Sequence, residues 1–192
     1  MANDIITSIN WIDVLITIIA LRILYIGIKL GIVIELFKLV SVFFAVFVTL
    51  HYFSSLSQFL HDKVSISDNV SMVIAYAFLW FTVIFVFKLI RDGITTVFKV
   101  EAHSLFDKWG GLVIAIGRGL LISSLAVFFL LTPRVEYFKK TIEHSVMGSR
   151  LVHVAPKFYE SCYDGLVSKF FPHEELNKSV FTLHDFSTEK KQ

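Results

Sequence analysis

Long unbroken runs of apolar residues fill the first two-thirds of the chain, in place of the spaced apolar positions of a soluble amphipathic helix. Four runs can each supply a helix of roughly 20 residues, which at about 1.5 Å per residue crosses the roughly 30 Å hydrocarbon core of a bilayer. These runs cover residues 11–28, 39–60, 69–87 and 109–133. The pattern therefore predicts an all-α, polytopic membrane protein with four transmembrane helices.

The connections between these runs differ in character. Only residues 27–31 separate the first two spans, so these spans form either a tight hairpin or one long broken helix. The second connection, 51–68, is polar and rich in serine. The third, 88–108, alternates basic with apolar residues, which is typical of a helix lying in the membrane interface. Pro133 is a natural stop for the fourth span.

The chain beyond Pro133 has ordinary polarity. Its apolar residues recur at three- and four-residue steps, which predicts an amphipathic helix that begins or is kinked at Pro156. The recurring positions are Leu151, Ala155, Phe158, Cys162, Leu166 and Phe170. The chain thus divides into a transmembrane domain, 1–135, and an amphipathic C-terminal tail, 136–192.

Composition agrees with a bilayer as the main surroundings of this chain. Of the 192 residues, 55% are hydrophobic and 18% are charged, and the mean hydropathy is +0.70, outside the usual range of water-soluble domains. The formal net charge is only +2, and no basic cluster is interleaved with aromatics, which argues against nucleic acid as a partner. The lone Cys162 excludes an intramolecular disulfide.

The distribution of Lys and Arg predicts an orientation. The first and third connections carry most of the basic residues near membrane ends, so they are expected in the cytoplasm, with both termini on the other side. Arg134, Lys139 and Lys140 follow the last span and oppose that orientation.

Several charged residues lie within or beside the predicted spans, where each costs roughly 2.5 to 3.5 kcal/mol on insertion scales. They are Asp13, Arg22, Lys29, Glu35 and Lys38 in the first hairpin, and Asp107 and Arg118 near the start of the fourth span. Glu35 and Lys38 stand at i and i+3 and can pair locally. Asp107, Gly111 and Arg118 share one face of an unbroken helix. A polar seam or ion path is one interpretation, and snorkelling residues with ion pairs that fix helix depth are the favoured one.

Glycines form a second pattern. Gly27 and Gly31 are four residues apart, and Gly110, Gly111, Gly117 and Gly119 cluster in the fourth span. Small residues let helix backbones approach closely in membranes. For Gly27 and Gly31 a hinge and a packing role are equally favoured, whereas the second set is expected to serve helix packing, within the chain or between copies.

Arrangements typical of catalysis are missing from the sequence. The seven histidines, at 51, 61, 103, 144, 153, 173 and 184, have no metal-ligand spacing and are expected at the surface or in the interface. Ser123 and Ser124 are expected to bond the preceding helical turn rather than act as nucleophiles. We therefore expect no enzyme, no cofactor and no metal.

Three ordered features resemble those of the bacterial CvpA family, the colicin V production proteins. They are Asn10, Trp11, Ile12 and Asp13 at the first span, Arg22 followed by Gly27, Gly31 and Glu35, and Asp107 to Gly111 leading to Gly117, Arg118 and Gly119. The resemblance covers roughly residues 10–150. It implies a small multi-pass protein of the bacterial inner membrane, associated with production or export of the toxin colicin V, and it marks these positions as important without assigning them a chemistry.

The leading hypothesis is an accessory inner-membrane protein that acts through helix contacts with itself or with other inner-membrane proteins. A small ion channel or transporter is the alternative, because the intramembrane charges and the glycine-broken hairpin resemble discontinuous helices at ion sites. A membrane enzyme is the third option.

Overall fold

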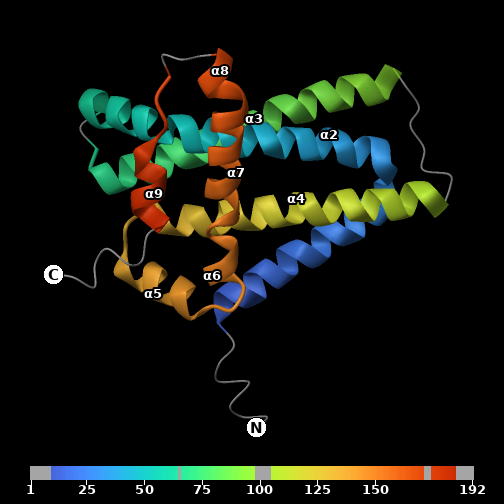
Figure 1. Cartoon of the computed structure of the whole chain (residues 1–192), viewed down its shortest axis with the longest axis horizontal. Helices are drawn as coiled ribbons and strands as arrows, with labels where there is room; N and C mark the ends of the chain where they lie inside the picture. Colours follow the sequence, from blue (N-terminus) through green and yellow to red (C-terminus); the bar gives the residue numbers. More distant parts are fainter. Residues whose placement is uncertain (1–9, 65, 98–104, 171–173, 185–192) are drawn as a thin grey trace, which may run out of the picture.

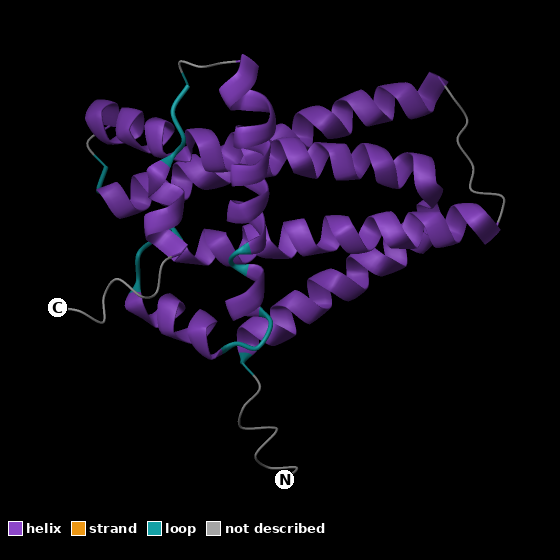
Figure 2. Cartoon of the chain, viewed as in Figure 1, coloured by secondary structure: helices purple, strands orange, loops and turns teal. Residues whose placement is uncertain are grey.

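The computed structural model of the chain is built from helices (Figure 1), and among the residues that it describes, 10–64, 66–97, 105–170 and 174–184, no strand occurs (Figure 2). The three long helices are α2 (Trp11–Val64), α3 (Asp68–Val97) and α4 (Leu105–Leu131). Shorter elements follow: α5 (Glu136–His144), α6 (Gly148–Leu151), α7 (Val154–Cys162), the π-helical turn η1 (Tyr163–Val167), α8 (Ser168–Phe170) and α9 (Lys178–His184). The predicted all-helical class is confirmed.

Three of the described helices are long and apolar enough to cross a membrane, where the sequence pattern predicts four spans. The difference arises because the first two predicted spans belong to α2, which is interrupted at Gly31. Gly31 has a φ of 73° and a ψ of 176°, a left-handed backbone conformation that L side chains rarely adopt. The first half of α2 climbs to the Gly31 bend at the right of Figure 1, and the second half runs back from it.

The polar stretch 51–68 is mostly helix and not the connection that its composition predicts. α2 continues through it to Val64, and His51, Phe53 and Ser57 within it are buried. Most of its polar residues, among them Ser55, Gln58 and Lys63, are exposed on the continuing helix, whereas the buried His51 contacts Tyr159 of α7. Sequence composition alone does not register such contacts.

The basic stretch 88–108 does not begin a separate interfacial helix. Residues 88–97 continue α3 without a break, whereas 98–104 lie outside the described residues. The stretch between Phe87 and Val97 contains no residue that ends a helix. Gly93 weakens a helix, but a helix interior tolerates it. α4, by contrast, ends at Leu131 just before Pro133, as predicted.

The tail packs across the three long helices. Tyr159 of α7 and Val180 of α9 lie in one buried core with Leu50, Tyr76 and Leu125, and the Tyr76 hydroxyl donates a hydrogen bond to the Leu125 carbonyl at 2.9 Å. A second core joins the beginning of α2 to the end of α4, α5 and the segment before α7, through Ile12, Ile16, Val127, Leu131, Ile142 and Val152.

Pro156 falls inside the first turn of α7, where a missing N–H leaves no helical hydrogen bond unmade. The helix begins at Val154, so the predicted start near Pro156 is correct to within two residues. Of the predicted apolar positions, Ala155 is buried and Phe158 packs against the first core. The side chains of Leu166 and Phe170 lie outside the described residues.

Candidate functional site

The two glycine groups of the sequence meet where α2 crosses α4. A Cβ built on Gly27 would lie 2.4 Å from the Ala115 Cβ, and one on Gly111 would lie 2.6 Å from the Gly27 carbonyl oxygen and 3.0 Å from the Gly31 carbonyl carbon. Real Cβ atoms do not approach other heavy atoms so closely, so both positions require glycine at this separation of the helices. The crossing holds α4 against the Gly31 bend.

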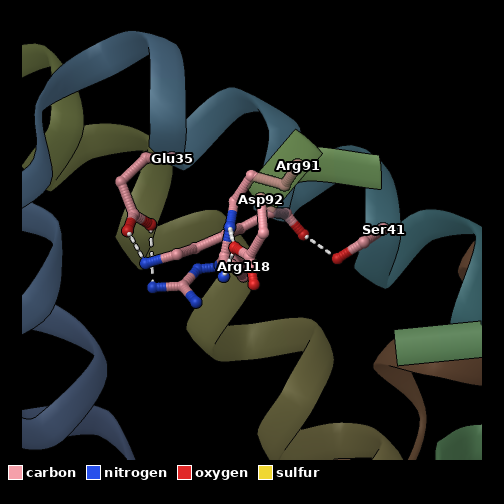
Figure 3. Close-up of polar contacts among 6 residues, drawn as sticks. Glu35, Ser41, Arg91, Asp92 and Arg118 are labelled. Carbon is pink, nitrogen blue, oxygen red and sulfur yellow. Dashed lines mark hydrogen bonds and ion pairs between the residues drawn. The ribbon is translucent and has the colours of Figure 1, made fainter. Parts of the chain in front are cut away.

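The close crossing brings Glu35, one turn after the bend, to Arg118 of α4 (Figure 3). Glu35 is fully buried, and its Oε2 forms an ion pair with Arg118 Nη2 at 2.7 Å. Lys38 Nζ donates a hydrogen bond to Glu35 Oε1 at 2.8 Å, so the predicted local pair is present. We call Glu35, Lys38 and Arg118 the buried charge cluster; one carboxylate serves two cations.

A buried ion pair is costly to desolvate, and removing one partner typically destabilises by about 3–5 kcal/mol because the other charge is left without compensation. Arg118 is only 7% exposed, and its buried Nε has no hydrogen-bond acceptor among the described residues. The cluster therefore carries an excess positive charge and an unused donor.

A cavity of about 270 Å³ adjoins the cluster, and its wall includes Lys38, Lys88, Arg91 and Arg118. Arg91 pairs with its neighbour Asp92, Nη2 to Oδ1, at 2.6 Å (Figure 3). The Ser41 hydroxyl donates a hydrogen bond to the Lys38 carbonyl at 2.7 Å. Three helices thus contribute basic side chains to one small space.

Asp13 lies outside the cluster and binds the loop between α5 and α6. Its Oδ1 accepts hydrogen bonds from the Ser145 hydroxyl at 2.7 Å and from the Met147 N–H at 2.8 Å. This carboxylate fixes the beginning of α2 to the tail. The sequence marks Asp13 but gives no sign of its partners, which lie more than 130 residues away.

The remaining charged and aromatic positions marked by the sequence are scattered. Trp11 is 41% exposed and meets Phe138 edge-to-face, with ring centroids 6.4 Å apart. Arg22 is exposed on α2, and Asp107 is partly exposed near the start of α4. None of these three contributes to the buried charge cluster. The cluster therefore contains only some of the residues that carry the family resemblance.

The other glycines of α4 differ in their packing. A Cβ on Gly110 would meet the flexible end of Ile32 at 2.3 Å, and one on Gly119 would make ordinary contact with Ile23 at 3.6 Å. A Cβ on Gly117 would meet nothing within 4 Å among the described residues. Within the described part of the chain, Gly117 is therefore not a packing position.

Sequence reasoning missed a second polar site, centred on His51. Its imidazole is buried, bonding the Tyr159 hydroxyl through Nδ1 at 2.8 Å and Glu174 Oε2 through Nε2 at 3.0 Å. The expected surface or interfacial place for this histidine is wrong, because α7 covers it. Asn177 completes the site, its N–H donating to the Tyr159 hydroxyl at 3.0 Å and its side-chain amide to the Leu50 carbonyl at 2.7 Å. We call these residues the tail clamp.

Ser124 also differs from expectation. Its hydroxyl donates to the Leu151 carbonyl and accepts a hydrogen bond from the Ala155 N–H at 2.7 Å. It therefore bonds the chain between α6 and α7 rather than the preceding turn of its own helix. Among the described residues no group of three or more His, Cys, Asp or Glu side chains is placed to hold a metal ion.

Comparison with known proteins gives one match. A family model described as "Colicin V production protein" matches residues 12–156. This range includes the whole buried charge cluster and both sides of the glycine crossing, and it reaches past α4 into the first turn of α7. No curated protein and no solved structure matches the chain.

Proposed function

Because the chain belongs to the colicin V production protein family, we propose that it is a multi-pass accessory protein of the bacterial inner membrane that acts through contacts with itself or with other membrane proteins. The observation that carries this proposal is the combination of an apolar exterior with a buried charge cluster. Phe81 and Trp109 are each 67% exposed, which suits contact with lipid or with a neighbouring helix. The charges of the cluster are instead turned inward.

Four crossings are part of this proposal, with the two halves of α2 each spanning once. The half before Gly31 has 20 residues and the half after it has 33, so each is at least about 30 Å long at 1.5 Å per residue. The loops then follow the distribution of basic residues, with the Gly31 bend and the α3–α4 connection in the cytoplasm and both termini outside it. Reporter fusions at 66 and at Gln192 test this: activity of a periplasmic reporter at both positions is expected, and activity of a cytoplasmic reporter at either contradicts the orientation.

The division of labour within the chain is a further part of the proposal. We assign residues 1–135 to the membrane domain and 136–192 to the tail, whose described part packs across the long helices and presents polar helix faces. Lys157 and Glu160 of α7 are exposed, while Ala155 and Tyr159 are buried. A polar surface held rigidly on a membrane domain suits contact with a partner protein more than catalysis, and we propose that the chain is not an enzyme.

Crosslinking in native membranes, followed by purification in mild detergent, tests the accessory role. We expect a reproducible adduct with a second copy or with another inner-membrane protein. The adduct should weaken in a Gly111→Val variant, which separates α2 from α4, and should persist in Gly117→Ala. Recovery of monomer alone from native membranes, with normal colicin V release by cells that lack the protein, would contradict the proposal.

A small channel or transporter is the second candidate, favoured by the buried charge cluster beside a glycine-broken helix. Its test is flux of radiolabelled ions through liposomes that contain the purified protein. The candidate requires flux that falls when Arg118→Met or Glu35→Gln is introduced. Equal flux from these variants and from Arg22→Gln removes it.

A further inference from the structure

The cavity beside the buried charge cluster has four basic residues and no acidic residue in its described lining, with uncharged side chains making up the rest. Lys38, Lys88, Arg91 and Arg118 line the cavity, whereas Glu35 and Asp92, which pair with three of them, are not among the lining residues. Four cations and two carboxylates leave an excess of two positive charges. Such a space attracts an anion with several oxygen acceptors.

Arg118 has a hydrogen-bond donor that lacks an acceptor in the part of the chain that the structure describes. Its Nε is buried and has no hydrogen-bond partner among the described residues, although the residue is only 7% exposed. Buried polar groups in folded proteins nearly always find a partner. The planar fork of an arginine is well matched to the oxygens of a phosphate group.

A second, apolar cavity, shallow and open to the surroundings, lies along the outside of α3 and adjoins the first. Its volume is about 430 Å³, and it is lined by Phe81, Thr82, Ile84, Phe85 and Lys88. Ile84 and Lys88 line both cavities. A ligand that fills the two spaces therefore has an anionic head and a hydrocarbon chain attached to it.

The position of these residues along α3 fits the edge of a bilayer. The uncharged stretch 69–87 covers about 28 Å as a helix, and Lys88 and Arg91 follow it directly. They are thus at the depth where lipid phosphates lie when this stretch spans the hydrocarbon core. Basic pockets between membrane helices on the cytoplasmic side are known to hold anionic head groups.

We infer that this pair of cavities is a binding site for an anionic phospholipid, with the phosphodiester between Arg118, Arg91 and Lys88 and one acyl chain along Phe81 and Phe85. The inference rests on the proposed membrane placement of α3. A free phosphate shares the head-group chemistry but leaves the apolar cavity empty, which is why the lipid is the better occupant.

Lipid retention tests the site. The wild-type protein and a Lys88→Gln/Arg91→Gln variant are purified in mild detergent, mixed with equal amounts of phosphatidylglycerol and phosphatidylcholine, and analysed by native mass spectrometry. Neither substitution removes a partner of Glu35, so the buried charge cluster stays intact. We expect the wild type to retain phosphatidylglycerol in preference, and the double variant to lose that preference by roughly thirtyfold, since each of the two basic residues near an anionic lipid contributes about 1 kcal/mol.

Arg22→Gln is the matched control, because Arg22 is an exposed cation on α2 that lines neither cavity. Its preference should equal that of the wild type. A Phe85→Ser variant should weaken retention of the lipid without changing the effect of inorganic phosphate on thermal stability.

Three results would overturn the inference: equal retention of the two lipids by the wild type, an equal loss in Arg22→Gln, or stabilisation by inorganic phosphate alone as large as that by phosphatidylglycerol. Membrane fractionation of each variant keeps the two proposals apart. A wild-type protein that stays in the membrane fraction but retains the two lipids equally contradicts the lipid site only, whereas a protein recovered in the soluble fraction contradicts the membrane placement itself.

Discussion

The two ends of the helix bundle are held together by different chemistry. At the Gly31 bend, the buried charge cluster and the Gly27–Gly111 crossing join α2 to α4 through full charges and direct backbone contact. At the other end, the tail clamp and Asp13 join the tail to α2 through a spread set of hydrogen bonds. Half of the six hydrogen bonds described above join uncharged groups, and the other three have a carboxylate of Asp13 or Glu174 as partner.

This difference predicts at which end of the bundle the protein tolerates single substitutions. In a low dielectric the energy of an unpaired charge is large, so the bend depends on each member of a small cluster. A neutral hydrogen bond contributes only about 0.5–1.5 kcal/mol net to the free energy of unfolding. At the tail the stabilisation is distributed over several such bonds. We therefore expect single substitutions to be severe at the bend and moderate at the tail.

Glu35→Gln should have the largest effect, because it leaves Lys38 and Arg118 buried without their shared carboxylate. We expect a loss of about 3–5 kcal/mol in the free energy of unfolding, measured by circular dichroism during titration of detergent-solubilised protein with SDS. Adding Arg118→Met to Glu35→Gln should restore part of this loss. If the double variant is less stable than the sum of the two single variants predicts, the cluster is not the source of the effect.

Gly111→Ala comes next, because the new Cβ would lie 2.6 Å from the Gly27 carbonyl oxygen and would push α2 from α4. Overpacking of this kind typically costs about 1–3 kcal/mol. The same SDS titration measures it. Gly117→Ala is the matched control in the same helix, where the new methyl group has open space and a gain of up to about 1 kcal/mol is expected from helix propensity. Equal effects at the two glycines would show that the crossing is not tight.

Tyr159→Phe tests the tail clamp. The change removes a hydroxyl that bonds His51 and receives the Asn177 N–H, and a loss of about 1–3 kcal/mol is expected from the buried groups left without a partner. Limited trypsin digestion should show faster release of the tail. Tyr137→Phe, at a 62% exposed position, should digest at the wild-type rate, and the clamp is contradicted if both variants are cleaved alike.

The same tyrosine gives the tail a pH dependence. Burial raises the pKa of Tyr159 to about 12 from its ordinary value of 10.0. The unfolded chain then loses this proton first, so the associated stability is present below about pH 10 and declines as the pH rises toward 12. The decline should be shallower in Tyr159→Phe; a variant that declines as steeply as the wild type would rule out a contribution from Tyr159.

The smallest effect is expected at Glu136 and Lys140 of α5, which form an exposed ion pair at 2.6 Å. Hydrogen bonding to Lys140 lowers the pKa of Glu136, so any stabilisation is present above the ordinary pKa of the carboxyl group and is lost as the pH falls through the lowered one. Glu136→Gln should leave the SDS midpoint at neutral pH essentially unchanged, because exposed pairs are screened. A clear shift would show that α5 contributes more to the fold than its exposure implies.

Much of the fold follows from local pattern. Apolar runs longer than a bilayer thickness require helices, because backbone groups in lipid must be bonded within their own segment. The i, i+3 pair of Glu35 and Lys38 and the stop before Pro133 are likewise local, and both are present. The predicted helix boundaries are wrong at 51–68 and 88–97, because α2 continues to Val64 and α3 to Val97 through polar residues that are mostly exposed on the helix surface.

The amino-acid sequence by itself determined that this protein is helical and apolar, that its charges are few, and which glycines and charges matter to its family pattern, since each of these depends on residues close together in the chain. Only the tertiary structure decided that Arg118 joins Glu35, that Asp13 binds the loop before α6, and that His51 is covered by α7. These pairs are 83 or more residues apart, and the burial that gives them their energy exists only after the helices have packed.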